Sequence, residues 1–396
     1  MRNNNFFKKP LFNHSIIPLF KRNMKIQMAD LGGQYLRLKD EIDAAVQDVL
    51  KSGTYIGGAP VAAFCERLAS YLDVPHVVPC GNGTDALRFA LQALHIGPEN
   101  DVVVPSFTYI APLEAVAAVG ASPVVVDVDP KSFNINPEQI EKAITAQTKA
   151  IIAVHLFGQS CHMEALITIA EKYNLHIIED NAQSLGASYL YSDGRSKKLG
   201  AIGTIGITSF FPTKPLACYG DGGALFTADS ALAEQIRLLA NHGQTEKYHH
   251  KIIGYNSRLD TLQAAILNVK LSYIEAFNER RIRLAEHYNK ALKSCPELAL
   301  PESFPYSTHV YHQYTIRVLN NKRNALKAYL SEKGISSNIY YPLPVYEQEA
   351  YKRVVRLSSR FYESKRLCNE VLSLPIYSEM TDEMQTFIIE TIQQFF

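Results

Sequence analysis

The chain has 396 residues, of which 47% are hydrophobic, and its formal net charge is +1. This length predicts one large α/β domain and a smaller second one. The near-zero charge gives no sign of a nucleic-acid-binding surface, and no apolar stretch reaches membrane-spanning length. The six cysteines are scattered without a CxxC pair, which argues against a zinc site and a disulfide framework.

The N-terminal residues 1–27 form an extension of unknown role. They lack the compact apolar core and small-residue cleavage site of a signal peptide, so we expect a cytoplasmic protein. Their basic residues Lys8-Lys9 and Lys21-Arg22 make a short cluster that is best explained as part of a solvated tail.

Along the chain, short apolar runs alternate with segments of helical periodicity, which indicates βαβ units in one sheet. The predicted strands are Val102–Val104, Pro123–Val128, Ala150–His155, His176–Ile178, Thr208–Phe211 and Ala224–Thr227. The predicted helices between them are Ile110–Val119, Pro137–Ile144 and Met163–Tyr173.

The last third of the chain predicts a small α+β domain. A long helix over Leu259–Leu292 leads into it, followed by a strand at Tyr314–Val318, a helix at Asn324–Lys333 and a helical region at Ser359–Leu374. We therefore expect a large domain over residues 28–275 and a small C-terminal domain over residues 276–396.

Lys214 lies in a short loop between an apolar run and a glycine cluster that leads into the next strand. Most lysines are solvated surface charges, and this is the alternative interpretation of an isolated Lys214. In a partly dry pocket, however, its amine can lose a proton and form a Schiff base with an aldehyde, the first step of pyridoxal-phosphate chemistry.

Asp180 follows the buried strand His176–Ile178, at the edge of the sheet where open α/β folds bind ligands. A carboxylate there can keep a pyridinium nitrogen protonated, as pyridoxal-phosphate enzymes require. Alternatively, Asp180 caps the following helix.

Two further segments fit the same cofactor. The glycines in Cys80–Leu87, ahead of a helical segment, suit a phosphate at a helix N-terminus, although glycine is common at such turns. Tyr109 follows the strand Val102–Val104, where its ring can stack on a flat cofactor or simply pack in the core.

The motifs GTDAL, SFTY, IIEDNAQSLGA, TSFFPTKPLACYGDGGAL and GYNSRLDTLQAA occur in this order. From about Asp30 to the C-terminus, the chain resembles the DegT/DnrJ/EryC1/StrS family of pyridoxal-phosphate-dependent nucleotide-sugar aminotransferases. Within the family it is most similar to enzymes that aminate the 3-keto group of UDP-2-acetamido-2-deoxy-ribo-hexuluronate. The resemblance implies fold type I of these transferases, as in aspartate aminotransferase, with a large mixed-sheet α/β domain and a smaller C-terminal α+β domain.

The resemblance also implies roles for single residues. Lys214 would be the catalytic Schiff-base lysine and the proton carrier. The other implied cofactor contacts are Asp180 with the pyridine nitrogen, Gln183 with the ring oxygen, Tyr109 on the ring face, and Thr84 and Ser209 with the phosphate of pyridoxal 5'-phosphate. Cys218, close to Lys214, has no matched histidine base and is interpreted as a small buried thiol.

Asn256 is expected to reach the phosphate of the neighbouring subunit's cofactor, which makes the protein a homodimer with shared active sites. Arg258 beside it and Arg37 near the pocket are candidates for the substrate's negative groups, because a guanidinium fork suits a carboxylate or phosphate. For Arg37, a surface ion pair is the alternative. Many relatives read His-Tyr-Pro where this chain has Tyr340-Tyr341-Pro342, so Tyr340 changes the hydrogen bonds offered to the sugar.

The implied reaction transfers an amino group from glutamate to a nucleotide-linked 3-keto sugar for surface polysaccharide synthesis. UDP-2-acetamido-2-deoxy-3-keto-glucuronate is the expected substrate, and a dTDP-linked 3-keto-6-deoxyhexose is the alternative. Relatives that dehydrate a sugar carry histidine at the position of Lys214. A regulatory, pyridoxal-phosphate-binding protein on the same scaffold would be expected to lose Lys214 or Asp180.

Overall fold

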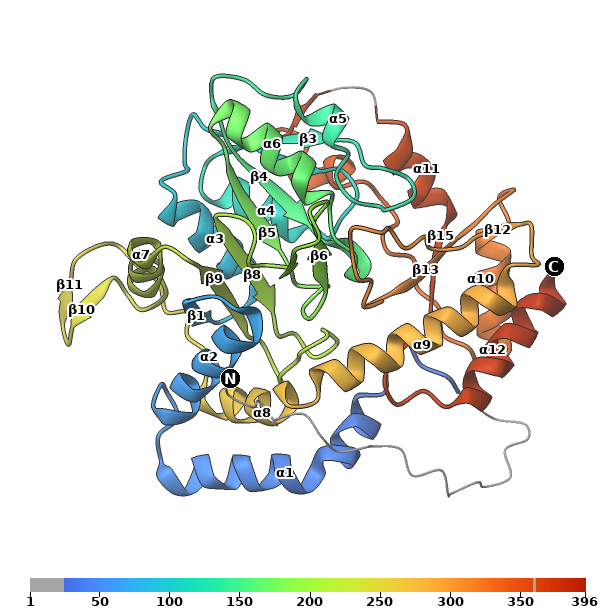
Figure 1. Cartoon of the computed structure of the whole chain (residues 1–396), viewed down its shortest axis with the longest axis horizontal. Coiled ribbons are helices and arrows are strands. Elements are labelled where there is room, and N and C mark those ends of the chain that lie inside the picture. Colours follow the sequence, from blue (N-terminus) through green and yellow to red (C-terminus); the bar gives the residue numbers. More distant parts are fainter. Residues whose placement is uncertain (1–24, 359–360) are drawn as a thin grey trace.

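The structure is a computed structural model that describes residues 25–358 and 361–396, so most of the expected N-terminal extension lies outside the described residues. Its centre is an eight-stranded mixed sheet (Figure 1). In spatial order the strands are β1 (His76–Cys80), β9 (Gly223–Thr227), β8 (Ile205–Ser209), β5 (His176–Asp180), β4 (Thr148–Val154), β2 (Asp101–Pro105), β3 (Ser122–Val126) and β14 (Arg356–Leu357). Neighbours from β8 to β14 pair in parallel, whereas β9 is antiparallel to both β8 and β1.

The central strands are apolar throughout because both faces of the sheet are covered. In β2, Val102 and Val104 belong to one core cluster and Val103 to another. In β5, Ile178 and Ile177 divide between the same two clusters. This alternation places successive side chains in opposite layers of the core.

Helices cover both faces of the sheet (Figure 1). One core layer includes α3 (Gly83–Ala93), α4 (Ala111–Ala118) and α7 (Ser230–Ala240), and the opposite layer includes α5 (Pro137–Ile140) and α6 (Met163–Tyr173). At the β1 and β9 end, α2 (Ala59–Leu72) and α8 (Thr261–Leu271) complete the core, and α1 (Leu31–Ser52) packs on α8.

A three-stranded antiparallel sheet of β12 (Leu298–Ala299), β13 (Tyr314–Val318) and β15 (Val371–Leu374) forms a second core with α9 (Ile274–Leu292), α10 (Arg323–Glu332) and α12 (Asp382–Phe395). In Figure 1, α9 runs from the large sheet to this second core. The remaining elements are α11 (Glu363–Glu370), the hairpins β6 (Ser188–Leu190) with β7 (Ser196–Lys198) and β10 (Gln244–Glu246) with β11 (His249–His250), and short 3₁₀ turns at Leu156–Gly158, Val345–Glu347 and Glu349–Tyr351.

The fold type I architecture expected from the sequence is confirmed, but four predicted elements differ. The helix predicted over Leu259–Leu292 is two helices that break at Ser272-Tyr273, because α8 packs between α1 and α2 while α9 continues to the second core. The helix predicted at Pro137–Ile144 ends at Ile140, after which the chain turns toward β4. The strand predicted at Thr208–Phe211 begins three residues earlier and ends at Ser209.

The fourth difference is the helical region predicted at Ser359–Leu374. Residues 359–360 lie outside the described residues, α11 occupies Glu363–Glu370, and the segment Val371–Leu374 is strand β15. The prediction was wrong for this apolar segment because it pairs with β13, which is more than 50 residues away in the chain, and local periodicity does not encode such a contact.

The division of the chain after residue 275 stays a proposal. Segments from beyond it return to the large domain: β14 adds to the eight-stranded sheet, and Val345 and Tyr346 belong to the large core. Conversely, Ile26 pairs with Ile335 and lies in the core of the small domain.

Candidate active site

A cavity of about 660 Å³ lies at the carboxyl ends of the parallel strands. It brings together most of the residues implied by the resemblance, although they are spread over more than 250 residues of chain. Its lining includes Thr84, Tyr109, Asp180, Gln183, Ser209, Lys214 and Tyr340. Asn256, Arg258 and Arg37 are not part of the lining.

The N-terminus of α3 forms one end of the cavity. Asn82 caps this helix, and its side-chain oxygen accepts a hydrogen bond from the Asp85 N–H at 2.8 Å. The first N–H groups of a helix have no acceptor within it, so they are free to bind an anion. Ser209 lies so close that a Cβ on Gly83 would be 2.8 Å from the Ser209 Cβ. Thr84 and Ser209 therefore line the same corner of the cavity.

Asp180 is the last residue of β5 and is 7% exposed. Its Oδ1 accepts a hydrogen bond from the Ala182 N–H at 3.1 Å. Burial raises the pKa of Asp180 above its ordinary value, and the Ala182 N–H and the nearby Lys214 amine oppose this shift. A carboxylate with so little solvation interacts strongly with a cationic ring nitrogen.

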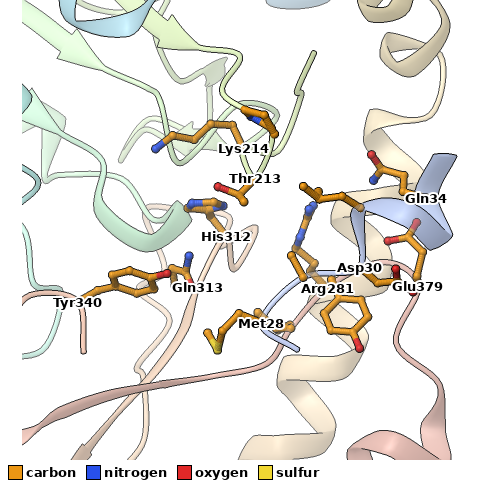
Figure 2. A pocket seen from close by; sticks show the side chains of 15 residues that line it. Met28, Asp30, Gln34, Thr213, Lys214, Arg281, His312, Gln313, Tyr340 and Glu379 are labelled. Atoms are coloured by element: carbon orange, nitrogen blue, oxygen red, sulfur yellow. The ribbon is translucent and has the colours of Figure 1, made fainter. Parts of the chain in front are cut away.

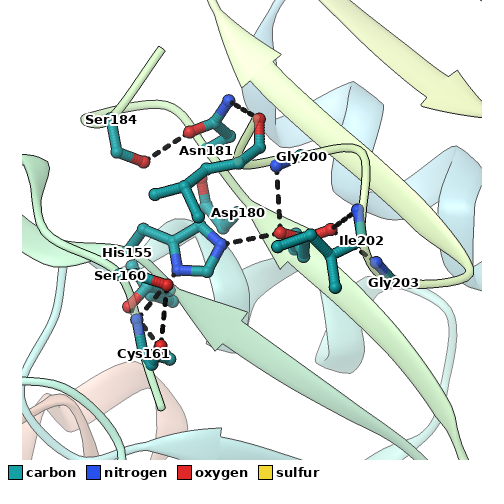
Figure 3. Close-up of polar contacts among 12 residues, drawn as sticks. His155, Ser160, Cys161, Asp180, Asn181, Ser184, Gly200, Ile202 and Gly203 are labelled. Carbon is teal, nitrogen blue, oxygen red and sulfur yellow. Dashed lines mark hydrogen bonds and ion pairs between the residues drawn. The ribbon is translucent and has the colours of Figure 1, made fainter. Parts of the chain in front are cut away.

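A buried polar network supports the end of β5 (Figure 3). Glu179 accepts hydrogen bonds from the N–H groups of Gly200 at 2.9 Å, Ile202 at 2.6 Å and Gly203 at 2.5 Å. His155 Nε2 lies 2.9 Å from Glu179 Oε2, and His155 Nδ1 accepts a hydrogen bond from the Cys161 N–H. Because Nδ1 is an acceptor, the ring carries its proton on Nε2 and donates it to Glu179. The network holds the backbone that carries Asp180.

Gln183 has a defined orientation. Its Oε1 accepts a hydrogen bond from the Phe157 N–H at 2.8 Å. Its Nε2 therefore points the other way and donates a hydrogen bond to the Tyr341 hydroxyl at 3.1 Å. The Tyr341 ring lies 6.3 Å from the Tyr109 ring, centroid to centroid, and Tyr109 is 57% exposed. An aromatic side chain this exposed at a cavity wall is available to cover a flat ligand.

Lys214 lies in the loop after β8, which closes on itself where the Phe210 N–H donates to the Gly222 carbonyl at 2.8 Å. Burial lowers the pKa of Lys214, and the Asp180 carboxylate partly opposes this effect. The amine is therefore more readily deprotonated than an ordinary lysine. Cys218, in the same loop, is fully buried, and burial raises its pKa to about 11, as expected for an unreactive thiol.

The sequence analysis did not identify His312 and Gln313, which line the cavity beside Lys214. His312 is 7% exposed and its Nδ1 has no hydrogen-bond partner among the described residues. Burial, with the positive charges of Lys214 and Arg281, holds the pKa of His312 well below its usual range. The only local signal is a polar His-Gln pair directly before the apolar strand β13.

The three residues outside the cavity have distinct surroundings. Asn256 is exposed and pairs through its backbone with Asn241. Arg258 donates to the Asn241 side-chain oxygen at 3.2 Å, and its buried Nε has no partner among the residues that the structure describes. Arg37 lies 2.7 Å from Glu379 in an ion pair and stacks over the Phe277 ring. The shared-site role of Asn256 and the substrate roles of Arg258 and Arg37 remain predictions.

Tyr340 lines the cavity, and its hydroxyl accepts a hydrogen bond from the Asn338 amide at 2.9 Å. Within residues 25–358 and 361–396, every helix is too short or too polar to cross a membrane.

The cavity fits pyridoxal phosphate on its own geometry. It offers a helix N-terminus for the phosphate, a buried carboxylate for the ring nitrogen, an amide for the ring oxygen and a lysine with a lowered pKa for the aldehyde carbon.

Residues 36–393 match the DegT/DnrJ/EryC1/StrS aminotransferase family. The chain is 44% identical to a UDP-2-acetamido-2-deoxy-3-oxo-D-glucuronate aminotransferase of Pseudomonas aeruginosa, over 89% of this chain and 95% of the relative. It is 42% identical to a dTDP-3-amino-3,6-dideoxy-alpha-D-galactopyranose transaminase of Aneurinibacillus thermoaerophilus, over 93% of this chain and 99% of the relative.

Among solved structures, S. venezuelae DesV in complex with a ketimine intermediate superposes with a TM-score of 0.90 at 38% identity, over 94% of this chain and 99% of that one. The chain therefore belongs to the DegT/DnrJ/EryC1/StrS aminotransferase family and is a pyridoxal-phosphate-dependent aminotransferase of nucleotide-linked keto sugars.

Proposed function

We propose that the enzyme transfers the amino group of glutamate to C3 of UDP-2-acetamido-2-deoxy-3-keto-glucuronate, in the cytoplasm, for the synthesis of a surface polysaccharide. The observation that carries the substrate assignment is Arg258, whose buried Nε has no partner among the described residues although the neighbouring Asn241 engages its other end. An open guanidinium beside Asn256 suits the carboxylate of a uronate. The 44% identical uronate aminotransferase supports this assignment.

The residues of the cavity divide the work of the reaction. Pyridoxal phosphate, when bound, supplies an electron sink for the negative charge left on carbon after a proton is removed. Asp180 holds a proton on the ring nitrogen, and Lys214 carries the proton to and from the reacting carbon. Tyr109 covers the ring and limits its tilt, and Gln183 donates a hydrogen bond to the ring oxygen.

The proposed site includes a second subunit. Asn256 is exposed and outside its own cavity, as expected for a side chain that completes the phosphate site of the neighbour in a two-fold dimer. Arg258 follows it by two residues and would enter the same neighbouring cavity. Tyr340, from the C-terminal part of the chain, would offer its phenol to a sugar hydroxyl.

A dTDP-linked 3-keto-6-deoxyhexose is the second candidate substrate. The 42% identical relative, a dTDP-3-amino-3,6-dideoxy-alpha-D-galactopyranose transaminase, supports it. The two candidates differ at C6, where the uronate carries a carboxylate and the deoxy sugar a methyl group. A cation near C6 favours the uronate, whereas a dry apolar wall favours the 6-deoxy sugar.

The test compares both keto sugars with glutamate as donor and detects the amino sugars by mass spectrometry. We expect Arg258→Leu to reduce kcat/KM on the uronate by about 10- to 100-fold, the effect of losing a charge-assisted hydrogen bond, and to change the 6-deoxy reaction much less. Arg237→Leu, on the exposed face of α7, is the control. Equal losses on both sugars, or a wild-type preference for the dTDP sugar, would contradict the uronate assignment.

A further inference from the structure

A second, smaller pocket adjoins the cofactor cavity and shares part of its lining (Figure 2). The two share Thr213, Lys214, His312, Gln313 and Tyr340 in their linings. The smaller one, here called the Arg281 pocket after the arginine of α9 that lines it, holds about 60 Å³. This is space for a few water molecules or for one small polar group.

Polar groups with unused hydrogen-bonding capacity converge on the Arg281 pocket. Gln34 of α1 is 9% exposed, and neither its amide nor that of Gln313 makes a side-chain hydrogen bond within the described part of the chain. His312 Nδ1 is buried and likewise without a partner there. Figure 2 shows Arg281 and His312 on opposite sides of the space, with Gln34 beyond Arg281. His312 Nδ1 is a fully buried atom, and such an atom is costly to leave unpaired unless a ligand or water satisfies it, whereas the two amides are not fully buried and can donate to a ligand.

The charges around the pocket do not balance. Lys214, which also lines the pocket, interacts with the Asp180 carboxylate of the cofactor cavity. The remaining charges are three cations, Arg37, Lys270 and Arg281, and two carboxylates, Glu379 and Asp30. Glu379 is paired with Arg37 at 2.7 Å, and Asp30 accepts the Gly33 N–H at the start of α1. This leaves the group one positive charge in excess.

The excess charge lies on Lys270 and Arg281. Lys270 is 2% exposed and faces the Tyr219 ring rather than a carboxylate. Arg281 is 6% exposed, and among the described residues its side chain has a single hydrogen bond, of 3.4 Å, to Asn278. Burial lowers the pKa of Lys270 to about 8 and that of Arg281 to about 10, and Glu379 only partly opposes these shifts. Buried cations in this state are stabilised by one more anion.

We propose that the Arg281 pocket binds one carboxylate group of a substrate, with Arg281 as the charged donor and Gln34 and Gln313 as neutral donors. A single carboxylate matches both the one uncompensated charge and the small volume, whereas a diphosphate exceeds both. The planar guanidinium can hold its two oxygens in parallel hydrogen bonds. This inference deepens the proposed function, on which it rests for the identity of the two substrates.

The carboxylate has two possible sources. The amino donor glutamate has two carboxylates, of which one is remote from the reacting amine. The uronate has one at C6, and if that group enters the Arg281 pocket, Arg258 does not hold it. Because the two half-reactions of a transaminase are separate, each source can be tested without the other.

The binding test uses holoenzyme and glutarate, a dicarboxylate without an amino group. We expect glutarate to raise the melting temperature of the wild type, and Arg281→Met to weaken its binding by about 10- to 100-fold. Arg283→Met, two residues along the same helix and half-exposed, is the matched control and should bind glutarate normally. Gln34→Glu introduces a carboxylate into the pocket, so it should abolish glutarate binding without lowering the melting temperature of the free enzyme.

The kinetic arms identify the source. If the pocket serves the donor, Gln34→Glu raises the KM for glutamate by about 10-fold or more and leaves the reaction of the aminated enzyme with keto sugar unchanged. If it serves the uronate, the pattern is reversed. The Gln34→Glu protein also covers the case in which Arg281→Met fails to fold.

Normal glutarate binding and normal values of both KM in folded Arg281→Met and Gln34→Glu proteins would overturn the carboxylate site. A second outcome is that these variants lose glutarate binding while the wild type aminates neither keto sugar. This result would support the carboxylate site and contradict the proposed substrates. The two failures are therefore distinguishable.

Discussion

Burial shifts the pKa values of the two residues that are central to the proposed reaction. Asp180 and Lys214 come from the ends of adjacent strands, β5 and β8, and each affects the pKa of the other. Burial makes each charge harder to maintain, and their mutual attraction only partly offsets this effect. The site is therefore less stable than it would be with neutral side chains, which is common for catalytic groups.

Replacing Lys214 with alanine should reduce transamination by several orders of magnitude, because this residue both anchors the aldehyde and carries the proton. The urea midpoint of the cofactor-free protein should not fall and should rise slightly at neutral pH, because the replacement removes an amine whose charge is costly to bury. Turnover of keto sugar and glutamate, followed by mass spectrometry, measures the first effect. Near-normal turnover by the purified variant would contradict the assigned role.

The raised pKa of Asp180 predicts a pH-dependent stability difference for Asp180→Asn in the cofactor-free protein. A carboxyl whose pKa is higher in the folded state contributes stability below its unfolded pKa and loses it as the pH rises through the folded pKa. The amide cannot ionise, so the free energy of unfolding of Asp180→Asn does not decrease in this pH range. We expect urea unfolding to show similar stabilities near pH 4 and a more stable variant at pH 7 to 8. A constant difference at all pH values would show that Asp180 is not destabilised by burial of its charge.

At the scale of elements, the position of α3 shapes the corner of the cavity that we propose for the cofactor phosphate. The helix begins at Gly83, directly beside Ser209 at the end of β8, and this proximity leaves no room for a side chain. Ser257 reinforces the contact from a third segment, since its hydroxyl accepts the Gly81 N–H at 3.0 Å and donates to Asp85 at 2.6 Å. The proposed phosphate site is therefore built by a helix and a strand together and not by one loop.

Gly83→Ala tests this interface. The added Cβ would be 2.8 Å from the Ser209 Cβ, so Ser209 must shift away from the phosphate. We expect the affinity for pyridoxal phosphate, measured by fluorescence titration, to fall by about 10-fold, equivalent to one hydrogen bond. Gly97→Ala, whose Cβ would have an ordinary contact of 3.6 Å with the Val119 carbonyl, is the control. Unchanged affinity of Gly83→Ala would place the phosphate elsewhere.

At the scale of the whole molecule, we propose a dimer in which residues of the partner subunit complete each cavity. Asn256 and Arg258 lie in the segment between the exposed hairpin β10–β11 and α8, outside their own cavity. A monomer would then retain Lys214 and Asp180 but lack part of the phosphate and substrate contacts.

Subunit mixing separates an action within one chain from an action across the interface. Asn256→Ala alone should weaken retention of pyridoxal phosphate without changing the circular dichroism spectrum. When it is mixed with Lys214→Ala subunits, a shared site predicts that each heterodimer regains one site with both native residues, so activity returns. If Asn256 acts within its own chain, every site carries a defect and mixing restores nothing. A fully active monomer in sedimentation would also reject the shared site.

Much of this enzyme could be predicted from its sequence because the residues proposed to contact the cofactor lie in short motifs at strand ends. Thr84, Tyr109, Asp180 and Lys214 each lie at or after the end of a strand. Alternation of strands and helices places the carboxyl ends of successive strands at one edge of a sheet, so these residues come together there. Each motif combines a local turn with an adjacent strand, so its position in space depends little on distant segments. The same locality explains why most strands were predicted within a few residues of their observed bounds.

Other features depend on contacts between segments that are distant in the chain. His312 and Gln313 reach Lys214 only because β13 and β15 form the second core, and no spacing in the sequence links them to the cavity. For the same reason Val371–Leu374 is a strand despite its helix-like neighbourhood, and Leu259–Leu292 is divided between two helices. The grouping of Gln34, Lys270 and Arg281 likewise arises where α1, α8 and α9 meet. Burial and charge balance are properties of such assembled surfaces, so they follow from tertiary packing and not from local sequence patterns.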